Sequence, residues 1–298
     1  MTVENADPLD SGTARIAVII GTCCYSDEVL QDVRDRSDCT LYSWNPLIDG
    51  RIHVNPFRMD ACIETLKANG VTHALHAGAV SVDDLSALLN RAEDEDDNVR
   101  AENDNYMRYP ARFYRSYARR LKEAGIEIIS PAHLLPGKYA PVSGMFNHGA
   151  ILAELLTVAD DLKMGTAADC ANAMNQQVAP HDPMRIGYIP RSAVYETVQP
   201  KDGGTPVFRQ IAMESTGSKA MLKSLSAKTA GVRRLLLKVR PSDFPKSLDC
   251  PTISPETIDA AHQAGIDLIA IDCEHGLIID RDATLNAADK AKIILYGF

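Results

Sequence analysis

The sequence predicts an α/β protein with two domains, each with a mostly parallel sheet flanked by helices, and a ligand cleft between them. Short apolar runs, such as residues 15–20 and 233–239, alternate with segments of helical spacing. This alternation is typical of buried parallel strands joined by crossover helices. A chain of 298 residues is also long enough for two hydrophobic cores. Its composition, 45% hydrophobic and 24% charged, is that of an ordinary globular protein.

The first domain is predicted over residues 14–137, as a Rossmann-like α/β domain. It follows a polar, aperiodic leader, residues 1–13, which we expect to be disordered. Helices are predicted where apolar residues recur at helical spacing before a glycine that suits a helix C-terminus. The predicted elements are strands at 15–20, 41–44, 71–77 and 126–130 and helices at 59–69 and 109–124.

The second domain is predicted over residues 138–298, after a Pro- and Gly-rich segment, 131–144, that is our candidate hinge. Residues 165–202 lack a clear pattern, and no element is predicted there. The remaining apolar runs and helical segments alternate as in the first domain. They predict strands at 207–213, 233–239, 268–271 and 293–296 and helices at 151–162, 218–224, 256–264 and 283–290.

The net charge and the motifs of the sequence argue against several classes of function. The net charge of −9 argues against nucleic acid as a general partner, and a phosphate-bearing substrate then needs local cations. No apolar run has the length of a membrane span and the first residues are acidic, so we expect a cytoplasmic protein. The seven cysteines are predicted to be reduced thiols. The eight histidines show no helical metal spacing, and no nucleophile elbow favours a serine hydrolase.

The segment from Lys238 to Thr257 is the most informative part of the chain. Ser254 and Pro255 are a helix-start signal, and helix N-termini attract anions. Asp249 lies shortly before that start and could position a hard metal ion or a water against a bound phosphate. The alternative is that Asp249 only shapes a Pro-rich turn. Lys238 ends an apolar strand, where we expect it to contact phosphate rather than extend into solvent.

Gly21 and Thr22 follow the first predicted strand. In α/β folds, ligands bind at the carboxyl ends of such strands, so this turn is a candidate binding loop. A dinucleotide site would require three glycines at fixed spacing, and the sequence here reads Gly-Thr-Cys-Cys-Tyr. A nicotinamide cofactor is therefore not favoured.

Residues 238–298 contain an ordered series of motifs: Lys238, Asp249, Pro251-Thr252-Ile253-Ser254, Ala264-Gly265, Ile279-Asp280-Arg281 and the closing apolar run 293–298. This order resembles the C-terminal domain of the LpxI-type UDP-2,3-diacylglucosamine pyrophosphatases. Weaker similarity extends over most of residues 14–298. The sequence departs from the family pattern in the first glycine-rich turn, of which Gly21 alone is kept, and in an Asp after Thr216 that has no counterpart.

The resemblance implies that the chain is a divergent family member, a Mg²⁺-dependent hydrolase of UDP-2,3-diacylglucosamine in lipid A biosynthesis, with UMP and 2,3-diacylglucosamine 1-phosphate as products. Asp249 would be the catalytic residue and a metal ligand. Glu214 would be a second metal ligand; alternatively, it is an exposed residue at a strand end. The substrate-binding residues would be Gly21, Thr22, Gly78, Thr216, Lys238, Thr252 and Ile253.

Two other functions stay open at this point. One is a non-catalytic sensor of a nucleotide sugar or phospholipid-like ligand with the same fold, motivated by the lost glycines and the missing Asp. The other is a pyrophosphatase that acts on a different nucleotide sugar. The expected partner is a UDP-linked acylated sugar, with peripheral contact to the inner membrane through this lipid substrate. A homodimer is left open.

Overall fold

The computed structural model describes residues 14–20, 30–33, 36–44, 51–56, 58–77, 110–141, 192–198, 207–214, 218–239, 248 and 250–297. The chain divides into two compact units. The first unit comprises Met1–Leu134 with Ser247–Asp249, and the second comprises Leu135–Lys246 with Cys250–Phe298. Among the described residues, no helix combines the length and the apolar character that crossing a membrane requires.

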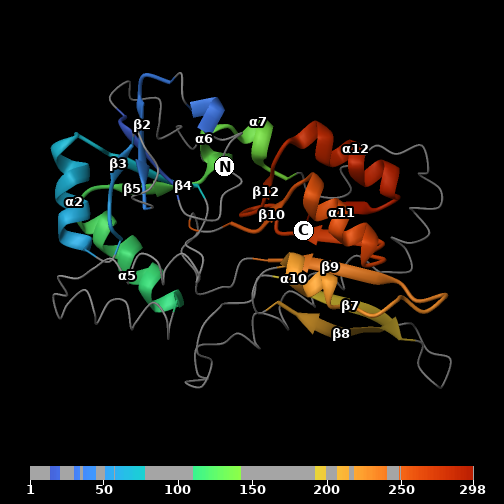
Figure 1. Ribbon diagram of the computed structural model, residues 1–298. Helices are drawn as coiled ribbons and strands as arrows, with labels where there is room; N and C mark the ends of the chain where they lie inside the picture. Colours follow the sequence, from blue (N-terminus) through green and yellow to red (C-terminus); the bar gives the residue numbers. More distant parts are fainter. Residues whose placement is uncertain are drawn as a thin grey trace, which may run out of the picture. The chain divides into compact units, whose positions relative to one another are not determined.

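The first unit is built on a five-stranded parallel sheet, in the order β3-β2-β1-β4-β5 (Figure 1). Every residue of the central strand β1 is buried, as its uninterrupted apolar sequence predicts. The direction of strand addition reverses at β1, so a topological switch point lies between β1 and β4. The strands are β1 (Ile16–Ile20), β2 (Cys39–Ser43), β3 (Ile52–His53), β4 (His73–Ala77) and β5 (Glu127–Ile129).

Two helices described in this unit, α2 (Met59–Ala68) and α5 (Pro110–Glu123), confirm the predicted helical segments. Each is followed by a glycine with positive φ, which ends the helix at little steric cost. The segment predicted as a hinge contains two short helices that begin with proline, α6 (Pro131–Leu134) and α7 (Pro136–Tyr139). The division between the two units falls between them.

The second unit contains a mixed five-stranded sheet in the order β13-β11-β9-β7-β8. Strands β13, β11 and β9 are parallel, whereas β7 is antiparallel to both of its neighbours. Strand β7 lies in the region where no element was predicted. The strands are β7 (Ser192–Val198), β8 (Val207–Met213), β9 (Arg234–Lys238), β11 (Leu268–Ile271) and β13 (Ile294–Gly297), with a separate parallel pair, β10 (Thr252–Ile253) and β12 (Leu277–Ile278).

Among the described residues of this unit, three helices contribute to the core on one face of this sheet: α10 (Ser218–Lys223), α11 (Pro255–Gln263) and α12 (Arg281–Ala291) (Figure 1). The predicted start of α11 is confirmed, because the amide of Thr257 donates to the side chain of Ser254. Apolar residues from strands and helices form one core cluster. Its members include Val194, Leu236, Ile269, Met221, Ile258 and Ala288.

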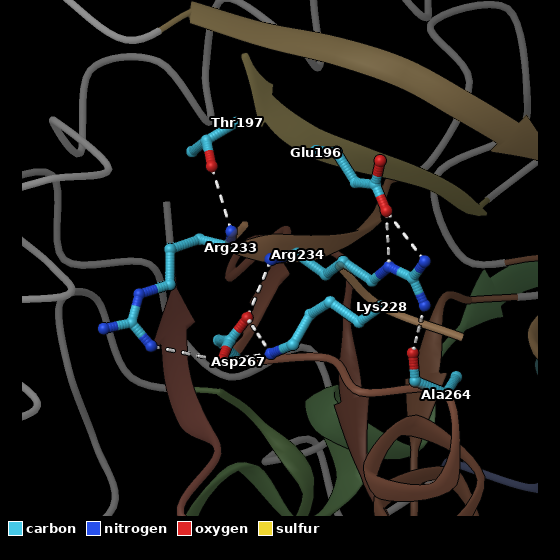
Figure 2. A network of polar contacts seen from close by, with 7 residues as sticks. All are labelled: Glu196, Thr197, Lys228, Arg233, Arg234, Ala264 and Asp267. Atoms are coloured by element: carbon cyan, nitrogen blue, oxygen red, sulfur yellow. Dashed lines mark hydrogen bonds and ion pairs between the residues drawn. The ribbon is translucent and has the colours of Figure 1, made fainter. Parts of the chain in front are cut away.

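A network of ion pairs and hydrogen bonds lies at the amino-terminal end of β9 and β11 (Figure 2). Arg234 opens β9 with a side chain that is 2% exposed, and its Nε and Nη2 atoms both lie 2.7 Å from Glu196 Oε1 on β7. Its Nη1 donates to the carbonyl oxygens of Ala264 and Ser226, at 2.7 and 3.0 Å. The guanidinium is therefore compensated by a carboxylate and by two carbonyl groups, as a buried cation requires.

Asp267, directly before β11, completes this network (Figure 2). Its carboxylate accepts hydrogen bonds from Lys228 Nζ at 2.8 and 2.9 Å and from the Arg234 amide at 2.8 Å. Arg233 Nη1 lies 3.5 Å away. The network connects β7, β9 and the approach to β11, so it stabilises the strand arrangement on which the opposite edge depends.

Candidate functional site

Three polar residues form a row at one end of the second sheet, where the parallel strands β9 and β11 have their carboxyl termini. We call this end the carboxyl edge. Ser192, the first residue of β7, pairs in register with Lys238, the last residue of β9. Glu214 directly follows β8, and its amide donates to the Ser192 carbonyl at 3.0 Å. Residues opposite each other on neighbouring strands point to the same face, here the face that carries Val194 and Leu236. We call Glu214, Ser192 and Lys238 the polar row.

All three members of the polar row are buried. Their exposed fractions are 3% for Glu214, 1% for Ser192 and 5% for Lys238. Lys238 Nζ donates to the hydroxyl of Ser218, the first residue of α10, at 2.9 Å. The ammonium of Lys238 therefore does not extend into solvent, and Glu214 is not an exposed residue at a strand end. Buried charges of this kind are rare outside structural networks and functional sites.

A tight turn lies beside the polar row, where β11 ends. The Asp272 amide donates to the Lys238 carbonyl at 3.1 Å. The Asp272 carboxylate accepts hydrogen bonds from the amides of Glu274 and His275, and His275 Nδ1 lies 3.1 Å from its Oδ2. A side chain on Gly276 would collide with the Asp272 carbonyl and the Ile271 side chain, so the turn requires glycine there.

The turn also sets the charge of Asp272. Burial favours the neutral carboxyl group, but the hydrogen bonds from His275 and from the two backbone amides favour the carboxylate more strongly. The pKa of Asp272 is therefore lowered from its ordinary value of 3.8. His275 is itself buried, and its ring is oriented by this carboxylate. No role was predicted for either residue, although the Asp-x-x-His-Gly spacing is a signal that the sequence offers.

Two predicted substrate contacts lie in β10. The Thr252 hydroxyl donates to the Cys250 carbonyl at 2.9 Å. The Ile253 side chain is fully buried in the core cluster of the second unit, and its carbonyl accepts from the Ile279 amide at 2.9 Å. The structure therefore uses Ile253 in packing and in the β10–β12 pairing.

The other predicted site residues, Asp249, Thr216, Gly21, Thr22 and Gly78, lie outside the described residues. Both neighbours of Asp249 in the chain, Leu248 and Cys250, are buried. In the first sheet, Ile20 pairs in register with Ala77 at the ends of β1 and β4. The carboxyl ends of β1 and β4 lie at the topological switch point, where α/β folds bind ligands. Gly21 and Gly78 directly follow these two strands in the sequence.

The described residues contain few side chains that could together bind a metal ion. Among the ranges given above, no three His, Cys, Asp or Glu side chains form a group that could hold one. Mg²⁺ needs fewer protein ligands, because it is commonly held by one or two carboxylates together with waters and substrate phosphates. Of the two predicted metal ligands, Glu214 is the one whose position is described, in the polar row. A hydrated Mg²⁺ that also binds phosphate is therefore compatible with this carboxylate.

Comparison with known proteins relates this sheet to one family. Residues 209–296 match the family model of the LpxI C-terminal domain. The match extends from β8 to β13, so it contains Glu214, Lys238 and Asp249 but neither Ser192 nor residues 1–134 of the first unit. A search among curated proteins finds no match. Residues 209–296 are thus similar to the LpxI C-terminal domain, and they carry two of the three members of the polar row.

Proposed function

We propose that this protein is a Mg²⁺-dependent hydrolase of lipid A biosynthesis. It cleaves the pyrophosphate of UDP-2,3-diacylglucosamine to UMP and 2,3-diacylglucosamine 1-phosphate. The similarity of residues 209–296 to the LpxI C-terminal domain supports this reaction. The observation that carries the proposal is the buried ammonium of Lys238 at the carboxyl end of a parallel strand within that segment.

Lys238 binds the pyrophosphate of the substrate. Its ammonium is oriented by Ser218 and is shielded from water, where an opposite charge is stabilised more strongly than at the surface. Because the chain carries a net charge of −9, a local cation of this kind is needed for a substrate with two phosphates.

Glu214 and Asp249 are the carboxylates that we propose to hold Mg²⁺. When bound, the metal neutralises charge on phosphate oxygens and makes water a better nucleophile. Asp249 orients this water. Hydrolysis consumes one water molecule: its oxygen forms a bond to phosphorus, the P–O bond of the anhydride breaks, and a proton is released.

The remaining predicted residues contribute to substrate binding. Thr216 provides a hydroxyl group for phosphate oxygens, and Thr252 does so by exchanging its hydrogen bond to the Cys250 carbonyl for one to the substrate. Ile253 contributes through packing beneath the site. Gly21, Thr22 and Gly78 provide backbone groups after the strands at the switch point of the first sheet. The acyl chains of the substrate bring the protein to the inner membrane surface.

The test is UMP release from UDP-2,3-diacylglucosamine. We expect wild-type turnover to stop with EDTA, to return with added Mg²⁺, and to fall at least about 100-fold in Asp249→Ala. Asp259→Ala is the matched control, since Asp259 is an exposed residue of α11, and it should keep full turnover. Turnover that is indifferent to both EDTA and Asp249→Ala would contradict the proposal. Thermal stabilisation by the substrate without UMP release would instead favour the non-catalytic sensor.

A further inference from the structure

Ser192 is a buried hydroxyl whose polar atom is left unsatisfied. Its Oγ has no hydrogen-bond partner within the part of the chain that the structure describes. The next two residues of β7, Ala193 and Val194, are apolar and fully buried, as is usual in the interior of a sheet. A buried donor without a partner destabilises the folded protein, whereas alanine at the same position would not. The buried, unsatisfied hydroxyl therefore points to a partner that binds from outside the chain.

The position of Ser192 indicates what this partner touches. Strand β7 lies between β8 and β9, so Ser192 is the central member of the polar row. Neighbouring strands are about 4.8 Å apart, which places the backbones of Glu214 and Lys238 about 5 Å to either side. Because all three side chains share one face, a group that accepts a hydrogen bond from Ser192 lies within reach of the Lys238 ammonium.

The chemical groups of the polar row favour a ligand that carries an anionic oxygen. A serine hydroxyl donates one hydrogen bond, and an ammonium attracts negative charge and also donates. The two together suit a phosphate oxygen. Glu214 only accepts hydrogen bonds when ionised, so it suits the cation or the hydroxyl group that accompanies such a phosphate.

We infer that the Ser192 hydroxyl is a phosphate-binding group that, with Lys238, holds the diphosphate of a nucleotide ligand. This assignment rests on the proposed function for the identity of the ligand. It does not rest on the family comparison, because the match begins at residue 209 and leaves Ser192 outside.

Calorimetric titration with UDP and with inorganic pyrophosphate tests this inference, using Ser192→Ala and a matched control. The control is Ser224→Ala, since the Ser224 hydroxyl already donates to the Met221 carbonyl at 2.7 Å. We expect Ser192→Ala to weaken both probes about tenfold or more, as for a hydrogen bond to a charged group. Its unfolding midpoint should be unchanged or higher, because an unsatisfied hydroxyl is removed. Ser224→Ala should show the reverse: unchanged affinity and a slightly lower midpoint.

Three outcomes would overturn the assignment. The first is that Ser192→Ala binds both probes with wild-type affinity, or binds only UDP more weakly. Either result would show that Ser192 does not contact the phosphates. The second is a lowered unfolding midpoint of Ser192→Ala, which would make the hydroxyl a structural group. The third is a wild-type protein that binds neither probe.

Different results would contradict the phosphate-binding assignment of Ser192 and the proposed hydrolase function. One result would contradict only the proposed hydrolase function: wild type binds UDP and Ser192→Ala binds it more weakly, but no UMP is released from the acylated substrate. The phosphate-binding assignment of Ser192 would then still hold. If UMP is released with the same KM by wild type and Ser192→Ala, and UDP affinity is equal, the hydrolase stands and Ser192 does not bind phosphate.

Discussion

The two ends of the second sheet both bury charged residues, but they differ in how the polar atoms are satisfied. At the amino end, the Arg234 guanidinium meets Glu196 and two carbonyl groups, and Asp267 meets Lys228, Arg233 and a backbone amide (Figure 2). At the carboxyl edge, the polar row contains the unsatisfied hydroxyl of Ser192. Buried charge is therefore common to a structural network and to a candidate site. The unsatisfied donor distinguishes them, together with its place at the end of a sheet where ligands bind.

The largest effect is expected at the amino end, on stability alone. Glu196→Ala leaves the Arg234 guanidinium buried without its carboxylate, which should lower the free energy of unfolding of the second unit by about 3–5 kcal/mol. Urea unfolding followed by circular dichroism measures this change. Glu123→Ala is the control, because it breaks an exposed pair with Arg119 and should have a small effect. Equal effects of the two variants would show that the amino-end network is not a structural determinant.

At the carboxyl edge, the expected effect is on activity and not on stability. Lys238→Met keeps the volume of the side chain and removes its charge, so kcat/KM for UMP release should fall about 100-fold, which is near 3 kcal/mol. The unfolding midpoint should change much less than in Glu196→Ala, because the cost of burying the ammonium is removed together with its hydrogen bond to Ser218. A variant with wild-type kcat/KM, or one that unfolds like Glu196→Ala, would remove the distinction between the two ends.

The smallest effect concerns the turn beside the polar row. The folded-state pKa of Asp272 is lowered from 3.8, so the unfolded chain binds its proton more readily and folding is favoured while Asp272 is ionised. This contribution is present above about pH 4 and is lost as the pH falls through the folded-state pKa, because protonation then favours unfolding. The unfolding midpoint should therefore fall less steeply below pH 4 in Asp272→Asn than in wild type. Parallel pH profiles would show that the turn does not stabilise the carboxylate.

Local sequence rules predicted the strands and helices that local signals define. β1 and β11 are continuous apolar runs, β9 has an apolar centre between Arg234 and Lys238, and the start of α11 at Ser254 and Pro255 follows from capping chemistry. The two-residue strands β10 and β12 are too short to produce a periodic pattern. Strand β7 was missed because its conformation depends on pairing with β8 and β9, which lie elsewhere in the chain.

The same limit explains which members of the candidate site the sequence revealed. Lys238 is the last residue of β9 and Glu214 directly follows β8, so the rule that ligands bind at carboxyl ends of strands identifies both residues. Ser192 begins a strand, and only the antiparallel insertion of β7 brings that beginning to the same edge. Asp272 and His275 are brought together by a turn whose closure depends on Gly276, and no strand or helix pattern predicts that contact.

Hydrogen–deuterium exchange with and without UDP tests most directly that the carboxyl edge is the ligand-binding end. Peptides that contain Glu214 to Ser218 and those that contain Val239 to Cys250 should exchange more slowly with UDP, because they follow β8 and β9 at the polar row. Peptides that contain Lys228 and Asp267, at the amino end, should exchange at the same rate in both conditions. Slower exchange confined to the amino-end peptides, with none at the carboxyl edge, would contradict the account.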